Sequence, residues 1–396
     1  MIYLDYNATA PVRPEAIARM QELLAMPLNP SSVHRFGCEA KKYLENARKT
    51  IADAISAWPN EIIFTASGTE ANAMALRGIA GRRLMVSVVE HSSVLRQTLD
   101  SGRLTVDSIS PSTIYRPLST VPVTSSGLID LSALDAMLKG DAPALVSVML
   151  ANNETGVIQP IRDVAALCKK HGALLHCDAV QGLGKIPVDF GALGCDMMTI
   201  SGHKCGGPVG ASALVVRRDL PLTPLLSGGG QELGRRAGTE NVAAIAGFAI
   251  AVEKIDFSQM RRLRGWLDKA EQEMSNVKGQ RTKDNFDICP LPFVFGASAP
   301  RLPNTSCVAM PGVGNEVQLM DFDLKGFAVS AGSACSSGRI EASHVLAAMG
   351  VPKTLASCAI RISGGWATTE EEIVSFTEAW KGRQDSNLRH LAPKAV

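Results

Sequence analysis

Short apolar runs recur along the first two thirds of the chain, and each is followed by small or polar residues. Runs of this kind are typical of buried strands, and they occupy residues 61–65, 84–89, 144–150, 173–178, 196–204 and 211–216. Apolar residues at helical spacing lie between them, most clearly in residues 67–79 and 161–171. This alternation predicts an α/β fold, with a mainly parallel sheet and helices on both faces.

The pattern changes after residue 255. A charged helical stretch at 260–274 leads to a proline-rich segment around Cys289–Pro292. Strand and helix patterns then resume at residues 305–310, 316–324, 327–330, 343–349 and 359–363. We expect a large domain at residues 15–255 and a smaller α+β domain formed by residues 1–14 and 256–396. The tail from Gln384 to Val396 is predicted to be frayed.

Composition limits the partners and the cellular compartment expected for the protein. The chain has 396 residues and a formal net charge of +2, with mixed signs, so no nucleic-acid or anionic-membrane partner is expected. The longest apolar stretch, Val242–Val252, is too short to span a bilayer, and the N-terminus does not have the pattern of a signal peptide. Nine scattered cysteines without a C-x-x-C pair favour a reducing, cytoplasmic setting over disulfides or a zinc site, and no metal is expected.

Residues with useful chemistry gather just after the predicted strands. They are Thr69, His91, Asn153, Asp178, Gln181, His203 and Lys204. In open α/β sheets, ligands bind at the edge formed by the carboxyl ends of the strands. The sequence therefore predicts one ligand site at this edge.

Lys204 and Asp178 form the pair that pyridoxal 5'-phosphate needs. A lysine amine can form a Schiff base with the aldehyde of the cofactor. An aspartate can keep the pyridine nitrogen protonated, so that the ring accepts electrons. Taken alone, a lysine at the end of a strand is more often simply solvated.

Other residues of this edge suit the rest of the cofactor. Gly68 and Thr69 open a predicted helix whose N-terminal N–H groups can bind a phosphate, although an ordinary helix cap has the same pattern. Ser201 and His203 flank the lysine and can add donors. A second glycine-rich, basic stretch, 228–239, also suits an anion.

Three further residues have candidate roles at the ring. The flat imidazole of His91 can stack on the pyridine and transfer protons. Gln181 can donate to the phenolic oxygen, and Asn153 can bind that oxygen or a substrate carboxylate. Each of them has an equally ordinary structural interpretation when taken alone.

Two residues of the C-terminal third suit a nucleophile and a substrate anchor. Cys335 lies in a run of small and polar residues, 330–338, which cannot form an apolar face, so we interpret it as an accessible thiol nucleophile or an incidental surface cysteine. Arg361 lies in an apolar strand pattern, where it needs an anionic partner. That partner is either a substrate carboxylate or a structural carboxylate.

With these residues in place, the chain resembles the cysteine desulfurases of the class V aminotransferase family, in their nitrogen-fixation and housekeeping branch. The similarity extends from Tyr3–Pro11 to Thr369–Ile373. The motifs between them, in order, are Asn29–His34, Asn152–Gly156, Asp178–Gln181, Ser201–Lys204, Arg236–Asn241, Leu302–Thr305 and Gly332–Cys335. The resemblance implies the type I fold of pyridoxal-phosphate-dependent transferases.

The resemblance also implies a role for each residue. Lys204 carries the cofactor and acts as acid and base, and Asp178, Gln181 and His91 contact the ring. The phosphate is bound by Gly68, Thr69, Ser201 and His203, and by Thr239 from the partner subunit of a homodimer with shared sites. Asn153 and Arg361 hold the carboxylate of L-cysteine. Cys335 takes the sulfur as a persulfide, leaving alanine, and passes it to an acceptor such as an iron–sulfur scaffold protein.

Some positions depart from the pattern of this family. Ser363–Trp366 stands where relatives more often have Ser-Leu-Gly-Arg, and Val209 stands where lysine is common. We expect Trp366 to change the packing near Arg361, and Val209 to lower the positive potential near the site.

Other functions remain open on the sequence alone. A selenocysteine lyase or a lyase of the kynureninase type would share Lys204 and Asp178, but the second would not need Cys335. A partner-binding or scaffolding protein that has lost catalysis would lack the lysine or the cysteine, and both are present.

Overall fold

The computed structural model describes residues 1–96, 118–140, 142–275, 293–332 and 343–391. Its largest sheet is built from β2 (Ile62–Thr65), β3 (Arg83–Ser87), β4 (Leu118–Val121), β5 (Ala144–Met149), β6 (Leu174–Asp178), β7 (Met197–Ser201) and β8 (Ser212–Val216). The strand order is β2-β8-β7-β6-β5-β3-β4. Among these strands β8 pairs antiparallel with both of its neighbours, β2 and β7, and the other pairings are parallel, so the predicted mainly parallel sheet is confirmed.

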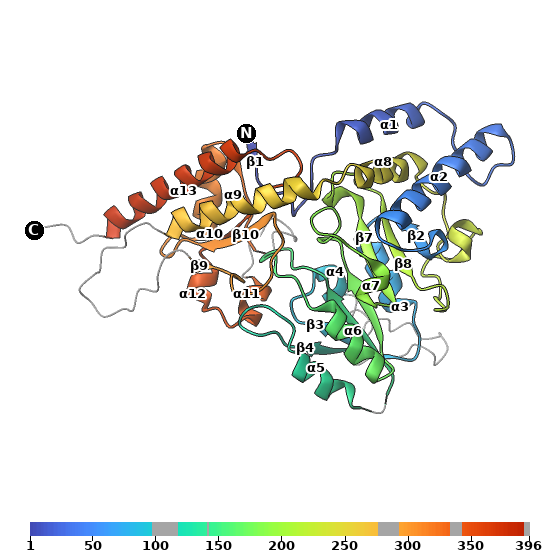
Figure 1. The fold of residues 1–396 in the computed structure, drawn as a ribbon, viewed down its shortest axis with the longest axis horizontal. Coiled ribbons are helices and arrows are strands. Elements are labelled where there is room, and N and C mark those ends of the chain that lie inside the picture. Colours follow the sequence, from blue (N-terminus) through green and yellow to red (C-terminus); the bar gives the residue numbers. More distant parts are fainter. Residues whose placement is uncertain (97–117, 141, 276–292, 333–342, 392–396) are drawn as a thin grey trace, which may run out of the picture.

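Alternate residues of the strands feed two cores, one on each face of this sheet. On β2, Ile62 and Phe64 belong to one core, and Ile63 belongs to the other. The first core is covered by α2 (Arg35–Ala54), α5 (Leu131–Leu138), α6 (Ile161–Lys170), α7 (Phe190–Leu193) and α8 (Val242–Glu253). The second is covered by α3 (Gly68–Arg77) and α4 (Ser92–Leu95), while α1 (Pro14–Leu24) packs on α8. Helices therefore cover both faces, as predicted (Figure 1).

A second group of elements surrounds a smaller antiparallel sheet. The sheet has the order β12-β10-β9, from β9 (Phe293–Val294), β10 (Thr305–Ala309) and β12 (Ala359–Ser363). Around it lie α9 (Phe257–Ser275), α10 (Asn315–Leu324), α11 (His344–Ala348), α12 (Lys353–Ala356) and α13 (Glu370–Leu391). These elements have their own core, which includes Phe322, Phe376 and Trp380. A further cluster packs Val89 of the first group against Phe295 and Leu346 of the second, and the predicted domain boundaries near residue 255 stay a prediction.

The prediction of a frayed tail from Gln384 is wrong as far as Leu391, because α13 continues to that residue. Ile373, Phe376 and Trp380 follow one another at helical spacing and are buried in the smaller core. Gln384 continues this face and is 2% exposed. Because these side chains pack in the smaller core, the helix continues into residues whose polar composition suggests disorder.

The first thirteen residues, which we call the N-terminal arm, cross from the smaller sheet to the larger one. β1 (Ile2–Tyr3) pairs in parallel with β11 (Phe327–Ala328), and Asp5 forms a bridge with Ser363 at the end of β12. Further along, the N–H of Ala10 donates to the carbonyl of His203 at 2.7 Å. The arm therefore joins β12 to the turn that carries Lys204. No helix in the described ranges is long and apolar enough to cross a membrane.

Candidate active site

A cleft of about 430 Å³ lies at the carboxyl edge of the large sheet, between the sheet, the N-terminal arm and β12. It brings together most of the residues predicted from the sequence: Gly68, Thr69, His91, Asn153, Asp178, Gln181, Ser201, His203, Lys204 and Arg361. The strands β3, β5, β6 and β7, which lead to His91, Asn153, Asp178 and Lys204, are parallel, so their carboxyl ends meet at one edge. Arg361 comes instead from β12 of the smaller sheet. The expectation of a single ligand site at this edge agrees with the geometry.

Lys204 ends a short 3-10 turn, Gly202–Lys204, directly after β7. Its Nζ donates to the backbone carbonyls of Asn7 at 2.8 Å and Ala8 at 2.6 Å, both in the N-terminal arm. The amine is thus directed into the cleft by residues from the N-terminal end of the chain. Because both carbonyls are uncharged acceptors, these two contacts orient the amine without neutralising it.

Asp178 is the last residue of β6 and is only 6% exposed. Its Oδ2 accepts a hydrogen bond from Asn72 Nδ2 at 2.8 Å, and its Oδ1 accepts one from the N–H of Val180 at 3.0 Å. Each carboxylate oxygen thus has a hydrogen-bond donor in this buried position. A buried carboxylate at the base of the cleft is a suitable partner for a protonated pyridine nitrogen.

His91 has a defined tautomer. Its Nδ1 lies 3.1 Å from the N–H of Ser93 and 2.8 Å from Ser93 Oγ. Because a backbone N–H can only donate, Nδ1 accepts, and we assign the ring proton to Nε2. Ser93 Oγ in turn accepts from Asn72 Nδ2 at 2.9 Å, which links His91 to the amide that holds Asp178.

The charge of His91 is set mainly by its burial. Burial lowers the pKa of His91, and the nearby cation of Lys204 lowers it further, although Asp178 acts in the opposite direction. The imidazole is therefore neutral near pH 7. A neutral ring with its proton on Nε2 can stack on an aromatic ligand and donate a proton.

The N-terminus of α3 forms one end of the cleft. Gly68 and Thr69 are its first residues, and the Ser67 side chain caps the helix by accepting from the N–H of Glu70 at 3.1 Å. A Cβ at position 68 would lie 3.1 Å from Val180 Cγ2, so glycine keeps this end open. Unpaired N–H groups at a helix start favour an anion such as a phosphate.

Ser201 and His203 can complete this anion site. Ser201 Oγ lies 2.7 Å from Ser212 Oγ, and His203 Nδ1 lies 3.2 Å from Thr9 Oγ1 in the N-terminal arm. Burial, with the cation of Lys204 adding to it, lowers the pKa of His203 to about 4. In the protein without ligand, both side chains are therefore neutral groups available for hydrogen bonding.

Arg361 on β12 closes the side of the cleft opposite the large sheet. It is 5% exposed, and it forms an ion pair with Asp5 and donates to the carbonyl of Asn153 at 2.9 Å. The structural ion pair that the sequence left open is thus present. The Nε of Arg361 is buried and has no hydrogen-bond partner in the described part of the chain, which leaves a donor for a carboxylate. The substrate-binding role of Arg361 stays a prediction.

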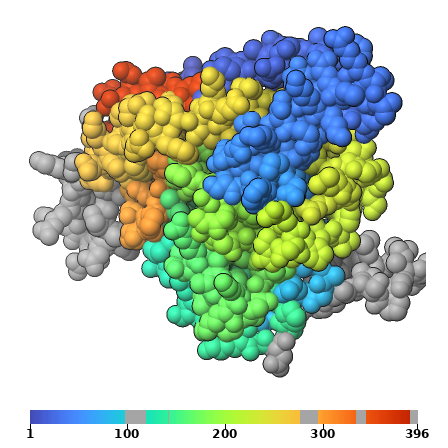
Figure 2. Space-filling model, turned by 45° about the vertical axis from the view of Figure 1, so that its right-hand side comes forward, coloured from blue at the N-terminus to red at the C-terminus, as the bar shows by residue number. Residues whose placement is uncertain are grey.

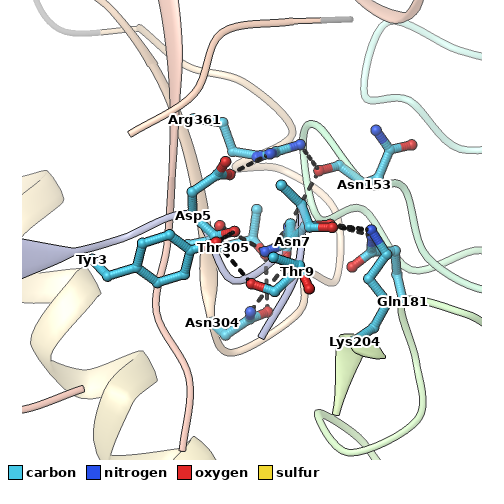
Figure 3. A network of polar contacts seen from close by, with 12 residues as sticks. Tyr3, Asp5, Asn7, Thr9, Asn153, Gln181, Lys204, Asn304, Thr305 and Arg361 are labelled. Atoms are coloured by element: carbon cyan, nitrogen blue, oxygen red, sulfur yellow. Dashed lines mark hydrogen bonds and ion pairs between the residues drawn. The ribbon is translucent and has the colours of Figure 1, made fainter. Parts of the chain in front are cut away.

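Sequence reasoning missed the N-terminal arm as part of this site. Asn7 accepts from Lys204, Gln181 and Asn304, and it donates to Thr305 and to the carbonyl of Asn153 (Figure 3). The only signal was the motif Tyr3–Pro11, which supports the family resemblance but assigns no role to any of its residues. No periodic pattern marks so short a polar segment.

Two predicted residues do not appear in the cleft. Thr239 is exposed and does not line the cleft of its own chain. Its predicted contact with the phosphate therefore depends on a second subunit. Cys335 lies outside the described residues. Ser330 and Gly332, which precede it, do line the cleft.

The two departures from the family pattern lie outside the cleft. Trp366 donates from Nε1 to the carbonyl of Pro11 at 2.9 Å, and the Arg13 guanidinium lies 4.9 Å from the centre of its ring. Trp366 thus packs on the N-terminal arm. Val209 is 71% exposed and does not line the cleft. Within the described ranges, no cluster of three or more His, Cys, Asp or Glu residues is placed to hold a metal ion.

Comparison with known proteins decides the family. The family described as Aminotransferase class-V matches residues 2–376. The chain belongs to the class V aminotransferases. The cysteine desulfurase IscS of Dictyoglomus turgidum is 37% identical to this class V aminotransferase, over 99% of this chain and 96% of its own length.

Solved structures agree with this assignment. A NifS-like protein from Rickettsia africae has a TM-score of 0.84 and 34% identity, covering 97% of this chain and 99% of its own. A structure of SspA in complex with cysteine has a TM-score of 0.77 and 28% identity, covering 92% of this chain and 98% of its own. The predicted family and the type I fold of this class V aminotransferase are therefore confirmed.

Proposed function

We propose that this class V aminotransferase is a pyridoxal-phosphate-dependent cysteine desulfurase, which converts L-cysteine to L-alanine and leaves the sulfur as a persulfide on Cys335. The observation that carries the proposal is the cleft itself. It holds the Lys204 amine and the buried Asp178 carboxylate, and the chain leading to Cys335 leaves from its rim at Gly332. The names of the relatives support the same activity.

The residues present fit the cofactor. Gly68, Thr69, Ser201 and His203 would offer uncharged donors for its phosphate, and Asp178 would hold a proton on the pyridine nitrogen. Lys204 would anchor the aldehyde. His91 would contact the ring, and Gln181 or Asn153 would donate to the phenolic oxygen. When bound, the cofactor supplies an electron sink that weakens bonds at the substrate carbons.

The other residues handle the substrate. Arg361 and Asn153 hold the carboxylate of L-cysteine, with the buried Nε of Arg361 as one available donor. Lys204 removes and returns protons at the substrate carbons. The Cys335 thiolate attacks the substrate sulfur, so that an S–S bond forms while the C–S bond breaks, and the carbon gains a proton. L-cysteine and the Cys335 thiol thus become L-alanine and a Cys335 persulfide.

Chain connectivity is compatible with this role for Cys335. It lies three residues after Gly332 in the sequence, and Gly332 lines the cleft. The seven cysteines among the described residues are all unpaired, and most are buried. This cysteine usage supports the proposal of a reducing, cytoplasmic setting.

We also propose a homodimer with shared sites. Glu232 anchors the segment that leads to Thr239, because its carboxylate accepts from Arg48 at 2.8 and 2.9 Å and from the N–H of Phe64 at 2.8 Å. Figure 2 shows α2 (blue) next to this segment (yellow-green) on one face of the molecule. Leu226 and Leu233, on either side of Glu232 in this segment, are exposed apolar side chains. Exposed apolar side chains in the segment that leads to the exposed Thr239 support a second subunit at this position.

The test is incubation of the protein with L-cysteine and a reductant, measuring alanine and sulfide together. We expect equal amounts of both, and a persulfide on Cys335 by mass spectrometry when the reductant is left out. Cys335→Ser should retain the bound cofactor but form no persulfide. Cys38→Ser is the matched control, because Cys38 is exposed and does not line the cleft, and it should keep full activity.

Sulfide release by Cys335→Ser at the native rate would contradict the assignment of the nucleophile.

A parallel reaction with selenocysteine distinguishes a cysteine desulfurase from a selenocysteine lyase, which would be inactive on L-cysteine. The acceptor of the persulfide, for which an iron–sulfur scaffold protein is the candidate, stays a prediction.

A further inference from the structure

Lys185 is a buried amine that the proposed reaction does not use. It follows β6 in the chain, four residues after Gln181, and it is only 4% exposed. Lysines are almost never buried to this extent without a partner of opposite charge. Within the described ranges, no carboxylate lies at ion-pair distance from Lys185; instead, its Nζ donates to Asn7 Oδ1 at 2.8 Å and to Gln181 Oε1.

The surroundings of Lys185 favour its neutral form. Burial holds the pKa of Lys185 well below its usual range, and the cations of Lys204 and Arg361 lower it further. A neutral amine has two hydrogens, and two oxygens accept them here. The side chain is therefore suited to holding two amides in place rather than to balancing a charge.

The first of these amides is that of Gln181. The nitrogen and oxygen of a glutamine amide have nearly the same shape, so hydrogen bonds decide which way it faces. The backbone carbonyl of Asn7 can only accept, and Gln181 Nε2 donates to it at 3.0 Å. Oε1 then faces Lys185, which satisfies it. The second N–H of Gln181 remains available to the cleft that Gln181 lines.

The second amide is that of Asn7, whose backbone carbonyl holds Lys204. Asn7 Oδ1 accepts from Lys185 and also from Asn304 Nδ2 at 3.1 Å. The same residue's backbone carbonyl accepts from Lys204 Nζ at 2.8 Å. Lys185 thus contacts Gln181 directly and Lys204 through Asn7, and it does not itself line the cleft.

We propose that Lys185 is a positioning residue, whose buried amine sets the orientation of the Gln181 amide and braces Asn7 behind Lys204. This inference rests on the proposed function, because it assumes that Gln181 donates to the bound cofactor. Lys185 acts through Gln181 and Asn7, and it does not touch the reacting atoms.

The test is Lys185→Met, which keeps the length of the side chain but has no donor. Replacing a buried, unpaired amine by an apolar side chain should leave the protein folded. We expect the absorption band of the bound cofactor to titrate at a shifted pH. We also expect the affinity of the apoprotein for pyridoxal phosphate to fall roughly fivefold, as for the loss of one hydrogen bond.

A double-mutant cycle with Gln181→Met locates the effect. If Lys185 acts through Gln181, the double variant should show the spectral shift of Gln181→Met alone. Lys185→Gln, which restores one N–H donor, should recover part of the shift and serves as the second variant should Lys185→Met fail to fold. Lys254→Met is the matched control, because Lys254 is an exposed lysine.

The outcomes are distinct. Absence of a cofactor band in the native protein would overturn the proposed function. A normal band in the native protein that Lys185→Met leaves unshifted would overturn the role of Lys185 alone. Fully additive shifts in the double variant would also overturn it, since Lys185 would then act independently of Gln181.

Discussion

The two sides of the cleft are built in different ways. On the strand-edge side, Asp178, Lys204 and His91 each follow a buried strand, and they carry the groups with useful chemistry. The N-terminal arm contributes mainly backbone carbonyls and the amide of Asn7. The sheet thus supplies the reactive groups, and the arm determines where the amine of Lys204 points. In this molecule the reactive residue and the residues that orient it come from opposite parts of the chain.

The arm also ties the strand-edge side to the smaller sheet. Asn7 contacts Asn304 and Thr305, and Asp5 pairs with Arg361 on β12. A change in the arm should therefore alter stability and substrate binding together. A change on the strand-edge side should remove chemistry and leave the fold intact.

The largest expected effect comes from Lys204→Ala. Removal of the amine should eliminate the covalent attachment of pyridoxal phosphate and lower desulfurase activity by at least about 100-fold, as expected for loss of an essential acid and base. Borohydride reduction followed by peptide mass spectrometry should find the cofactor on Lys204 in the native protein and on no residue of the variant. The midpoint of urea unfolding of the apoprotein should change little, because the hydrogen bonds of Lys204 to Asn7 and Ala8 are only partly buried or exposed. A variant with the native absorption spectrum would refute the assignment of Lys204.

Asn7→Ala should lower the stability of the protein and leave the covalent attachment of the cofactor intact, the reverse of Lys204→Ala. It removes the hydrogen bonds of the side chain to Lys185, Asn304 and Thr305 and keeps the backbone carbonyl that holds Lys204. Loss of several bonds to buried groups should lower the free energy of unfolding by about 2–4 kcal/mol. Urea denaturation measures this change, and borohydride reduction should still find the cofactor on Lys204.

Thr9→Ala is the matched control within the arm. The Thr9 hydroxyl makes exposed contacts with His203, so this variant should lose less than about 1 kcal/mol. If Asn7→Ala and Thr9→Ala lowered the free energy of unfolding by equal amounts, Asn7 would have no special role in connecting the arm to the rest of the protein.

The strand-edge side could be predicted from the sequence because its signals are local. Each reactive residue follows an apolar run, and parallel strands bring the ends of such runs to one edge. That reasoning is sufficient to assign Asp178, Gln181 and Lys204 to one site. The antiparallel direction of β8 was not predicted, since an apolar run has the same pattern in either direction.

The contribution of the arm could not be predicted in this way. Asn7 and Thr305 are 298 residues apart in the sequence, and Asp5 and Arg361 are 356 apart. Short polar segments have no hydrophobic periodicity that indicates which side chains face the protein interior. Contacts between residues this far apart in the sequence are therefore seen only in the folded structure. The buried position of Lys185 was missed for the same reason. Thr239 stays a prediction because it depends on a second subunit, and Cys335 lies outside the described residues.

The smallest expected effect concerns His203, which lies where the two sides meet. Burial lowers the pKa of His203 to about 4, below the unfolded value of about 6.5, so the unfolded chain binds its proton first as the pH falls. The folded apoprotein should therefore lose stability relative to His203→Gln between pH 7 and pH 5.5. The loss should be at most about 1 kcal/mol, because the side chain is only partly buried.

Urea denaturation of the native apoprotein and of His203→Gln, at both pH values, isolates this effect. The buried Glu90 carboxyl has a pKa well above its usual range and so changes stability in the opposite direction, but it is present in both proteins and cancels in the difference. With pyridoxal phosphate bound, a phosphate next to His203 would favour the protonated ring, and the pH dependence of the difference should shrink. A difference that stays the same with and without the cofactor would place the phosphate away from His203, and the anion site would then rest on the start of α3 and Ser201.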